Sequence, residues 1–368
     1  MLELDRSLVE EIGFNPYYNF FDNKKYIDLA SNNYLGLAEN EKVKQSAIDA
    51  IKKYGTSMCG TPIATGYIEL FEETERRLSS FVNLEHTIIF PSCYQANNGI
   101  FSVIANKEDI IIFDRFAHSS LIQGIKAVGC KISPFLHNDM NHLEQILSRS
   151  QGFKQIFVVT ESVFSTEGSI APFKEIDLLC KKYNAIPIVD DSHGIGVIGK
   201  DGKGILQYQN ITDFNGIYTA SLGKAFANSG GMVAGNKKII EYFRYYCPQL
   251  IYSTAIVPAS LGGINGVLDV LDTDYKALSS RMWNYKELIY NSVENIMKSE
   301  APINAINTGT AKETILLSKK LFENGILSTP FIEPSVPKNE GVVRLIAGAG
   351  LSEEQIKCAI EKIKSISL

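Results

Sequence analysis

The chain has 368 residues, of which 45% are hydrophobic and 21% are charged, and its formal net charge at pH 7 is −5. This composition excludes a disordered, collagen-like or coiled-coil protein, and the length suits two domains or one large domain with an appendage. The acidic balance gives no overall positive field that attracts nucleic acid or anionic lipid. We therefore predict an acidic globular enzyme.

The first residues, MLELDRSLVEEIGF, are acidic and lack the basic and apolar parts of a signal peptide, which predicts a cytoplasmic protein. The uncharged run Tyr245–Leu268 is long enough to cross a bilayer, but its prolines, glycines and polar residues argue against membrane insertion. The six cysteines are scattered and predict buried thiols in a reducing compartment. The histidines show no metal-ligand spacing, so His137 and His142 are interpreted as surface residues and no metal is predicted.

In chain order, an N-terminal arm (1–34) precedes a region in which short β-rich runs alternate with helix-length segments. The predicted strands are His86–Pro91, Ile110–Asp114, Ile156–Thr160, Ile186–Asp190, Gly216–Ala220 and Met232–Ala234. The predicted helices between them are Asn97–Ala105, Leu121–Val128, Asn141–Arg149 and Phe173–Tyr183. This alternation predicts an α/β fold with a mostly parallel sheet, helices on both faces, and ligands at the carboxyl ends of the strands.

After Pro258 the pattern changes to a long helical stretch, about Ala259–Lys298, followed by shorter apolar runs. The last predicted helix, Glu353–Ile366, is amphipathic and suits packing on a small sheet. We therefore predict three parts: the arm 1–34, a large domain 35–255, and a small C-terminal α+β domain 256–368.

Two residues carry the strongest chemical signal. Asp190 stands where an apolar strand meets a glycine-rich loop, which directs a carboxylate into a cleft, although a strand-end Asp can also simply cap a turn. Lys224 lies between a predicted strand and a loop of small residues, which favours a partly desolvated amine able to form a Schiff base over a solvated surface charge. Together they suit a pyridoxal 5'-phosphate site, in which the carboxylate keeps the pyridine nitrogen protonated.

Two further elements fit such a site. The turn Ser92–Tyr94 leads into a helix whose free N–H groups suit a phosphate, although Ser92 alone reads equally well as a plain N-cap. His118 stands just past a strand end, where an ordinary loop histidine is the alternative.

From about Ile27 onward the chain resembles the α-oxoamine synthases, pyridoxal phosphate-dependent enzymes of fold type I that condense an amino acid with an acyl-CoA. The resemblance rests on LASNNYLGL (29–37), SCYQANNG (92–99), FAHSSL (116–121), ESVFSTEGSIAPF (161–173), VDDSHGIGVIG (189–199), TASLGKAF (219–226), IYSTAIVPA (251–259) and VVRLIAGAG (342–350). Within the family, Asp-Asp-Ser-His (190–193) and the segments around His118, His137 and Lys224 look closest to the quorum-sensing α-hydroxyketone autoinducer synthases.

The resemblance implies a role for each matching residue. Lys224 is expected to form the internal aldimine and then act as acid and base at the amino acid Cα, Asp190 to pair with the pyridinium nitrogen, His193 to bind the ring hydroxyl, and His118 to stack on the ring. The expected phosphate ligands are the Cys93 and Tyr94 amides, Ser221, and Ser253 or Thr254 of a partner subunit; Ser165 is expected near the ring. Arg344 is expected to anchor the substrate carboxylate, with Asn32 as a further substrate contact, because a guanidinium forms a bidentate pair with a carboxylate.

The implied function is condensation of an amino acid, such as 2-aminobutyrate, with a medium- or long-chain acyl-CoA, which gives an autoinducer precursor. The alternatives are 8-amino-7-oxononanoate synthase, another α-oxoamine synthase, and a non-catalytic binding protein of the same fold. The chain lacks three features common in the biosynthetic members: a His before the segment starting at Gly66, Gly in place of Cys93, and a His in the segment Ala347–Gly350. A homodimer with shared active sites is expected.

Overall fold

The computed structural model describes residues 6–15 and 26–366. Its chain divides into two compact units. The sheet unit comprises Leu37–Phe164 and Ile170–Tyr275, and the C-terminal unit comprises Lys276–Leu368, Ser165–Ser169 and the segment up to Gly36. The predicted domain ranges 1–34, 35–255 and 256–368 divide the chain at other positions and stay a proposal; residues 1–5, 16–25 and 367–368 of these ranges lie outside the described residues.

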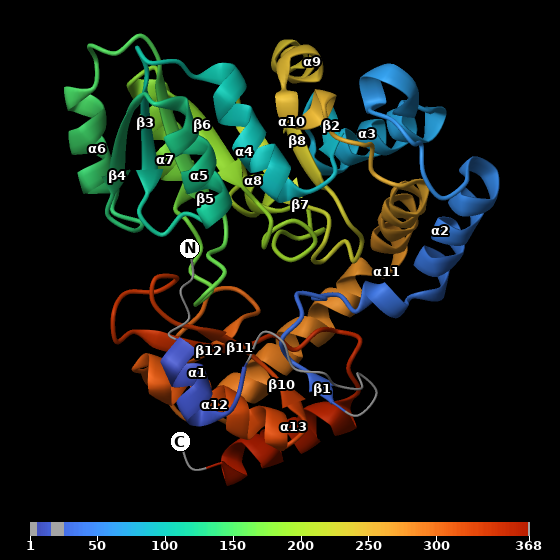
Figure 1. The fold of residues 1–368 in the computed structure, drawn as a ribbon, viewed down its shortest axis with the longest axis vertical. Coiled ribbons are helices and arrows are strands. Elements are labelled where there is room, and N and C mark those ends of the chain that lie inside the picture. Colours follow the sequence, from blue (N-terminus) through green and yellow to red (C-terminus); the bar gives the residue numbers. More distant parts are fainter. Residues whose placement is uncertain (1–5, 16–25, 367–368) are drawn as a thin grey trace. The chain divides into compact units, whose positions relative to one another are not determined.

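The sheet unit is built on seven strands in the order β2-β8-β7-β6-β5-β3-β4 (Figure 1). Their bounds are β2 His86–Phe90, β3 Ile110–Asp114, β4 Lys131–Phe135, β5 Ile156–Glu161, β6 Ile186–Asp190, β7 Ile217–Ser221 and β8 Gly231–Gly235. Only β8 runs antiparallel to its neighbours in this sheet. The mostly parallel sheet is therefore confirmed.

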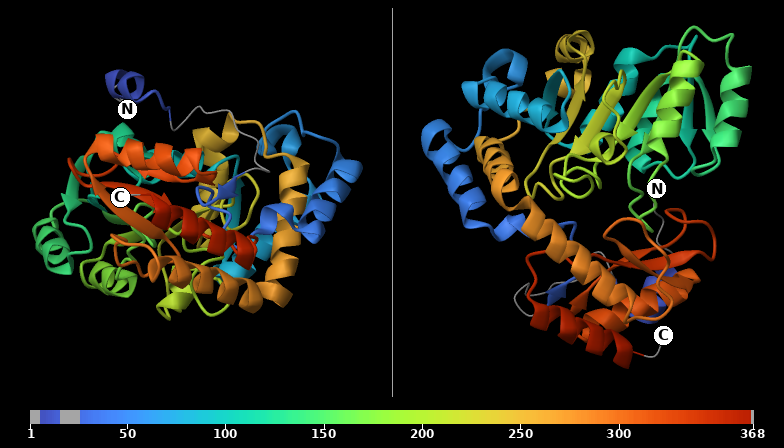
Figure 2. Two further views of the ribbon diagram at one scale, coloured as in Figure 1. Left: turned by 90° about the horizontal axis from the view of Figure 1, so that it is seen from below. Right: turned by 180° about the vertical axis from the view of Figure 1, so that it is seen from behind.

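Helices cover both faces of this sheet (Figures 1 and 2). All residues of β3 and β5 are buried, on both sides of the pleat, which is the pattern of a sheet with two covered faces. The helices of the unit are α2 Glu41–Tyr54, α3 Glu69–Val82, α4 Cys93–Ile104, α5 Ser119–Val128, α6 Met140–Arg149, α7 Phe173–Lys182, α8 Ile205–Tyr208, α9 Lys237–Tyr246 and α10 Pro248–Ile251, with shorter turns η2 Leu37–Glu39 and η3 Pro62–Gly66.

Two differences from the predicted elements have local causes. The helix α4 begins at Cys93, four residues before the predicted start, because the side chain of Ser92 caps it by accepting from Gln95 N. The strand β4 was not predicted, since Lys131 and Pro134, its two exposed residues, obscure its pattern; it lies at the sheet edge, where proline is tolerated.

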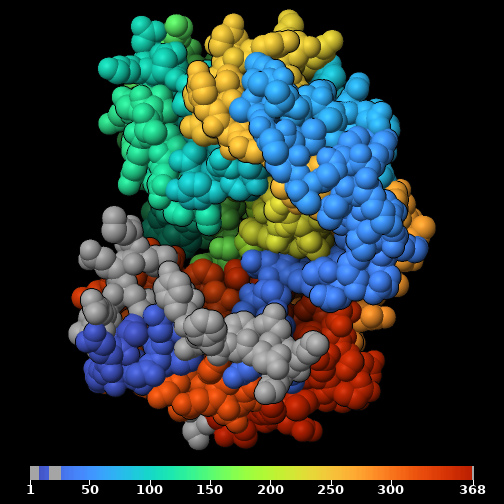
Figure 3. Space-filling view, turned by 45° about the vertical axis from the view of Figure 1, so that its right-hand side comes forward, coloured from blue at the N-terminus to red at the C-terminus, as the bar shows by residue number. Residues whose placement is uncertain are grey.

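An ion pair joins helices α3 and α9 of this unit. Glu75 of α3 is buried and binds Arg244 of α9, with Nη2 and Oε2 2.7 Å apart. Burial raises the pKa of the Glu75 carboxyl, and Arg244 opposes that shift. Figure 3 shows the blue residues of α3 beside the gold residues of α9 and α10 on one face of the molecule.

The long helix α11 (Pro258–Tyr290) supplies residues to each unit, and the division lies between Tyr275 and Lys276. In the C-terminal unit, β9 (Asn304–Gly309), β11 (Thr329–Phe331) and β12 (Gly341–Leu345) form an antiparallel sheet in the order β11-β12-β9. Helices α12 (Ala311–Glu323) and α13 (Glu353–Ser365) accompany it, together with α1 (Arg6–Ile12) and the parallel pair β1 (Ile27–Asp28) and β10 (Ile326–Leu327). The predicted terminal amphipathic helix is confirmed as α13, whose buried residues include Ile356, Ala359 and Ile363.

Among the described residues no helix is both long and apolar enough to cross a membrane.

Candidate active site

Asp190 ends β6 at the carboxyl edge of the sheet and is 4% exposed. Its Oδ1 accepts a hydrogen bond from the main-chain N–H of Ser192 at 2.9 Å, and its Oδ2 accepts from Asn97 Nδ2 at 2.6 Å. A buried carboxylate is costly unless it is hydrogen-bonded or paired, and here both oxygens have a donor. The structure therefore holds Asp190 as an oriented acceptor for a cation or an N–H group.

Lys224 lies in the loop between β7 and β8, and β7 pairs with β6 through Asp190 and Thr219. Main-chain hydrogen bonds close this loop, from Leu222 N to Gly230 O at 3.0 Å and from Ala227 N to Lys224 O at 2.8 Å. The positive charge of Lys224 contributes to lowering the pKa of His118, which places the amine within electrostatic range of that histidine. The predicted acid and lysine thus come to the same edge of the sheet.

The helix α4 presents its amino end at the same edge. Ser92 O accepts from Ala96 N, and the Ser92 side chain accepts from Gln95 N, so the amides of Cys93 and Tyr94 stand at the open first turn. Gly231 at the start of β8 permits this approach, because a Cβ there would lie 2.3 Å from Cys93 N and Cα. The first turn of α4 therefore packs closely against β8, at the position predicted to bind phosphate.

His118 caps the amino end of α5. Its Nδ1 accepts from Ser120 N at 3.2 Å and lies 2.7 Å from Ser120 Oγ. Part of the His118 side chain is exposed, but the neighbouring protein atoms displace water from its ring, and this desolvation lowers the pKa of the imidazole. The charge of Asp190 opposes this shift, and the charge of Lys224 adds to it. The lowered pKa favours the neutral imidazole, which suits stacking on the face of an aromatic cofactor.

The remaining predicted cofactor residues of the sheet unit lie in loops or at a strand end at this edge. His193 is buried three residues after Asp190. Ser221 donates its N–H to Ser192 Oγ at 2.9 Å, and its own Oγ accepts from Gly223 N at 3.2 Å. Ser253 Oγ accepts from Gln95 Nε2 at 3.1 Å, so the 253–254 loop lies beside α4 of its own chain. Its predicted contribution to a partner subunit, with Thr254, stays a proposal.

Three predicted residues belong to the C-terminal unit. Arg344 of β12 is 5% exposed, donates from Nη1 to Ser165 O at 2.8 Å, and lies over the Phe331 ring with Cζ 5.0 Å from the ring centroid. Its Nε has no hydrogen-bond partner among the described residues, nor has Asn32 Oδ1. Burial lowers the pKa of Arg344, and Tyr34 opposes this shift. An orphaned guanidinium N–H in a buried site suits the predicted carboxylate anchor.

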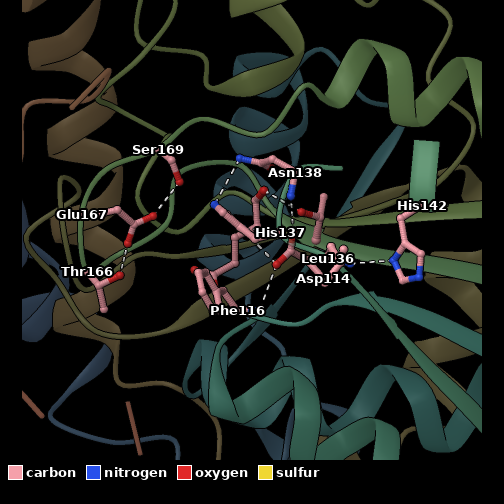
Figure 4. A network of polar contacts seen from close by, with 11 residues as sticks. Asp114, Phe116, Leu136, His137, Asn138, His142, Thr166, Glu167 and Ser169 are labelled. Carbon is pink, nitrogen blue, oxygen red and sulfur yellow. Dashed lines mark hydrogen bonds and ion pairs between the residues drawn. The ribbon is translucent and has the colours of Figure 1, made fainter. Parts of the chain in front are cut away.

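The sequence-based reasoning missed a second polar network, on the loops after β3 and β4 (Figure 4). The carboxylate of Asp114 is fully buried and accepts from Phe116 N at 2.8 Å, from Asn138 N at 3.0 Å, and from His137 Nδ1 at 3.1 and 3.2 Å. His142 Nδ1 accepts from Leu136 N at 3.0 Å. His137 is therefore not the surface residue that we predicted, since it fixes the loop that leads to His118.

Figure 4 also labels a cluster of the C-terminal unit, in which Glu167 accepts from the hydroxyls of Thr166 and Ser169.

Within the described residues no group of His, Cys, Asp and Glu could hold a metal ion. All six cysteines are free thiols.

The sheet unit fits pyridoxal 5'-phosphate by its donor set. Lys224 provides the amine for an aldehyde, Asp190 an oriented carboxylate for a pyridinium nitrogen, and His118 a neutral ring for the cofactor face. The first turn of α4 provides free N–H groups and the positive end of a helix dipole for the phosphate. The assignment of these individual residues to the cofactor stays a proposal.

Comparison with known proteins gives the family. The family model of aminotransferases class I and II matches residues 24–363. The 8-amino-7-oxononanoate synthase of Petrotoga mobilis is 33% identical over 349 residues, which cover 93% of this chain and 88% of the relative. The serine palmitoyltransferase of Bacteriovorax stolpii is 32% identical over 346 residues, which cover 92% of this chain and 81% of the relative.

A solved structure shows the same fold. The serine palmitoyltransferase from S. paucimobilis, with a bound PLP-myriocin aldimine, superimposes with a TM-score of 0.92 at 23% identity, over 98% of this chain and 95% of that chain. The fold type I architecture predicted from sequence is thereby confirmed, and the family model and the relatives confirm the predicted cofactor. The chain belongs to the aminotransferase class I and II family and, within it, to the pyridoxal phosphate-dependent α-oxoamine synthases.

Proposed function

We propose that this chain condenses an amino acid with an acyl thioester as an 8-amino-7-oxononanoate synthase, with alanine and a pimeloyl thioester as substrates. The observation that carries this proposal is the set of relatives that span almost the whole chain, of which the Petrotoga mobilis protein is one. They give no support to the autoinducer precursor that we predicted from the local motifs, and the biotin-precursor alternative fits them better.

The second candidate is a serine palmitoyltransferase-type reaction, because a relative of that name covers 92% of this chain at 32% identity. It requires serine and a long acyl chain in place of alanine and a dicarboxylic acyl group. Both candidates share the cofactor and the first chemical step, so the distinction between them lies in the substrate contacts.

In either reaction the cofactor supplies an electron sink for the carbanion that forms when the amino acid loses its Cα proton. Lys224 is the base that accepts this proton and the acid that returns it, and it lies in the loop after β7, at the edge of the sheet that holds Asp190. Asp190 keeps the ring nitrogen protonated by charge pairing, and His193 orients the ring hydroxyl. Arg344, with Asn32, binds the substrate carboxylate.

The expected assembly is a homodimer in which Ser253 or Thr254 of one subunit completes the phosphate site of the other, and the expected location is the cytoplasm. Mixing an inactive Lys224→Ala protein with an inactive Thr254 variant tests the shared site, since only heterodimers can contain one intact site. Recovery of activity on mixing supports it, and a fully active monomer contradicts it.

Three substrate pairs decide the reaction: alanine with a pimeloyl thioester, serine with palmitoyl-CoA, and 2-aminobutyrate with decanoyl-CoA. Products are identified by mass spectrometry, and kcat/KM for the first pair is expected to exceed the others by at least about tenfold, as one or more lost hydrogen bonds in a specific pocket imply. Lys224→Ala is expected to abolish turnover, and Lys200→Ala, an exposed lysine of the same unit, serves as the control. A non-catalytic protein of this fold would turn over none of the pairs.

A further inference from the structure

Three buried polar side chains that the sequence analysis did not single out connect the predicted cofactor residues. Asn97 of α4 is 1% exposed, Ser120 of α5 is 1% exposed and Thr219 of β7 is fully buried. They come from three different elements, and each hydrogen bond among them spans more than twenty positions of sequence. Such a network must have each donor matched to an acceptor, because an unmatched group is costly in the interior.

The orientation of the Asn97 amide follows from its partners. An ionised carboxylate only accepts hydrogen bonds, so the group 2.6 Å from Asp190 Oδ2 is the amide nitrogen. That nitrogen also donates to Ser120 Oγ at 3.0 Å, while the amide oxygen accepts from Thr219 Oγ1 at 2.9 Å. Asn97 therefore uses both of its N–H groups and its oxygen inside the network.

The proton on His118 follows in turn. A main-chain N–H always donates, so the 3.2 Å contact from Ser120 N makes His118 Nδ1 an acceptor. The Ser120 hydroxyl accepts from Asn97 and keeps its own proton for His118 Nδ1, 2.7 Å away. A neutral imidazole with an acceptor at Nδ1 carries its proton on Nε2.

We propose that Asn97 is a positioning residue of the cofactor site, which orients the Asp190 carboxylate directly and, through Ser120, fixes His118 as the Nε2–H tautomer. The chain of contacts runs from Thr219 through Asn97 to Asp190 on one branch and to His118 on the other. The proposal rests on the assignment of Asp190 and His118 to the cofactor made above, and it is independent of which amino acid or acyl group the enzyme uses.

The charges around this network come from every element packed on it. The titratable side chains that share the edge are Cys93 of α4, Asp114 at the end of β3, His118 of α5, Glu161 of β5, Asp190, Asp191 and His193 at and after the end of β6, Tyr218 of β7 and Lys224 of the following loop. Burial raises the pKa of Asp191 to about 7, which is within the pH range of many binding assays. Each variant is therefore compared with the unmodified protein at the same pH, so that the protonation of Asp191 affects both measurements alike.

The first experiment reads the tautomer directly, from ¹⁵N chemical shifts of the histidine rings in protein freed of cofactor. The chain has five histidines, and a His118→Gln sample identifies the signals of His118. We expect the Nε2–H tautomer in the unmodified protein, and loss of its exclusive population in Ser120→Ala. A predominant Nδ1–H tautomer, or an unchanged His118 spectrum in Ser120→Ala, overturns the proposal.

The second experiment measures affinity for pyridoxal 5'-phosphate by absorbance titration. Asn97→Asp keeps the shape of the side chain but places a second carboxylate against Asp190, so the pair is expected to share a proton. The affinity is expected to fall by at least about tenfold, because the shared proton weakens the charge pairing of Asp190 with the pyridinium nitrogen. A purely structural role of Asn97 predicts an affinity that is unchanged by this isosteric exchange.

Two further variants keep this experiment decisive. Asn304→Asp is the matched control, because Asn304 is fully buried in the C-terminal unit and donates to Lys286 O instead of a carboxylate. It is expected to leave both the His118 signals and the cofactor affinity unchanged. If Asn97→Asp does not fold, Thr219→Val removes one hydrogen bond without adding charge and is expected to weaken cofactor binding by a few fold, and no change in Thr219→Val overturns the proposal. Neither measurement uses a substrate, so failure of the proposed function leaves both results interpretable.

Discussion

The buried carboxylate of Asp114 gives a sharp test of how the loop before His118 is held. Its Oδ1 accepts from Phe116 N and its Oδ2 accepts from Asn138 N, at 2.8 and 3.0 Å. The two bonds tie the loop after β3 to the loop after β4. An amide has a single acceptor oxygen, so Asp114→Asn can satisfy only one of the two main-chain donors.

The other donor then faces the new NH₂ group in a site that excludes water. A buried donor that loses its acceptor costs roughly 1–3 kcal/mol, and we expect Asp114→Asn to lower the free energy of unfolding by about 2 kcal/mol. For a domain of this size class this corresponds to a decrease of about 4–8 °C in Tm. The freed loop lies two residues before His118, so cofactor affinity is expected to fall as well.

The matched control is Asp139→Asn, on the loop after β4. Asp139 caps α6 through one hydrogen bond, from His142 N at 2.9 Å, and asparagine caps helices as well as aspartate does. This variant is expected to change the stability by less than about 0.5 kcal/mol. Thermal unfolding, followed by circular dichroism with and without cofactor, compares the two. Equal Tm values for Asp114→Asn and Asp139→Asn would refute the reasoning that both oxygens of Asp114 are needed.

Three further predictions concern the site. Gly231→Ala places a Cβ 2.3 Å from Cys93 N, so it is expected to cost about 1–3 kcal/mol of stability and to weaken cofactor binding, whereas Gly152→Ala, with open space around its Cα, is not; equal stabilities contradict the close approach. The pKa of His118 is lower in the folded protein than in the unfolded chain. Its contribution to stability is therefore present above the unfolded pKa of about 6.5 and is lost as the pH falls through the folded pKa. His118→Gln is expected to show a flatter pH dependence of Tm in acid, and parallel curves for the two proteins contradict this. Arg344→Lys keeps the charge but loses the bidentate geometry, so KM for the amino acid is expected to rise by at least about tenfold with a smaller change in kcat, and an unchanged KM excludes Arg344 as the carboxylate anchor.

The sequence predicted the elements and residues whose signals are local. Asp190 and Lys224 each follow an apolar strand, and the strand order brings such residues to one edge of the sheet. Ser92 and the helix after it were predicted for the same reason. The family followed from motifs that are spread along the chain.

The residues that sequence reasoning missed act through contacts between distant segments. Asn97 bonds to Asp190 and Thr219, 93 and 122 positions away, and nothing near Asn97 in the chain indicates either partner. His137 looked like a surface residue because its partner Asp114 lies 23 positions earlier, on another strand. The one available signal is polarity in an otherwise buried helix face, where Asn97 stands between Ala96 and Gly99.

The relatives fit the biotin-precursor alternative better than the substrate that we predicted, for a different reason. Ser192 favoured the autoinducer branch and Cys93 counted against the biosynthetic members, whereas relatives matched over nearly the whole chain fit the biotin-precursor branch better. In the structure Cys93 Sγ and Ser192 Oγ are 3.4 Å apart, so the two unusual residues are neighbours and count as one local feature.

The antiparallel strand β8 restricts the position of Lys224. Because β8 pairs with β7, the loop that carries Lys224 is attached at both ends to one sheet. Main-chain hydrogen bonds from Leu222 to Gly230 and from Ala227 to Lys224 also restrain the loop. For the proposed role of Lys224, this anchoring gives the amine a high effective concentration at the cofactor site and leaves little chain entropy to be lost when the cofactor binds. Inserted residues in this hairpin would lower that effective concentration even if every side chain of the site were kept.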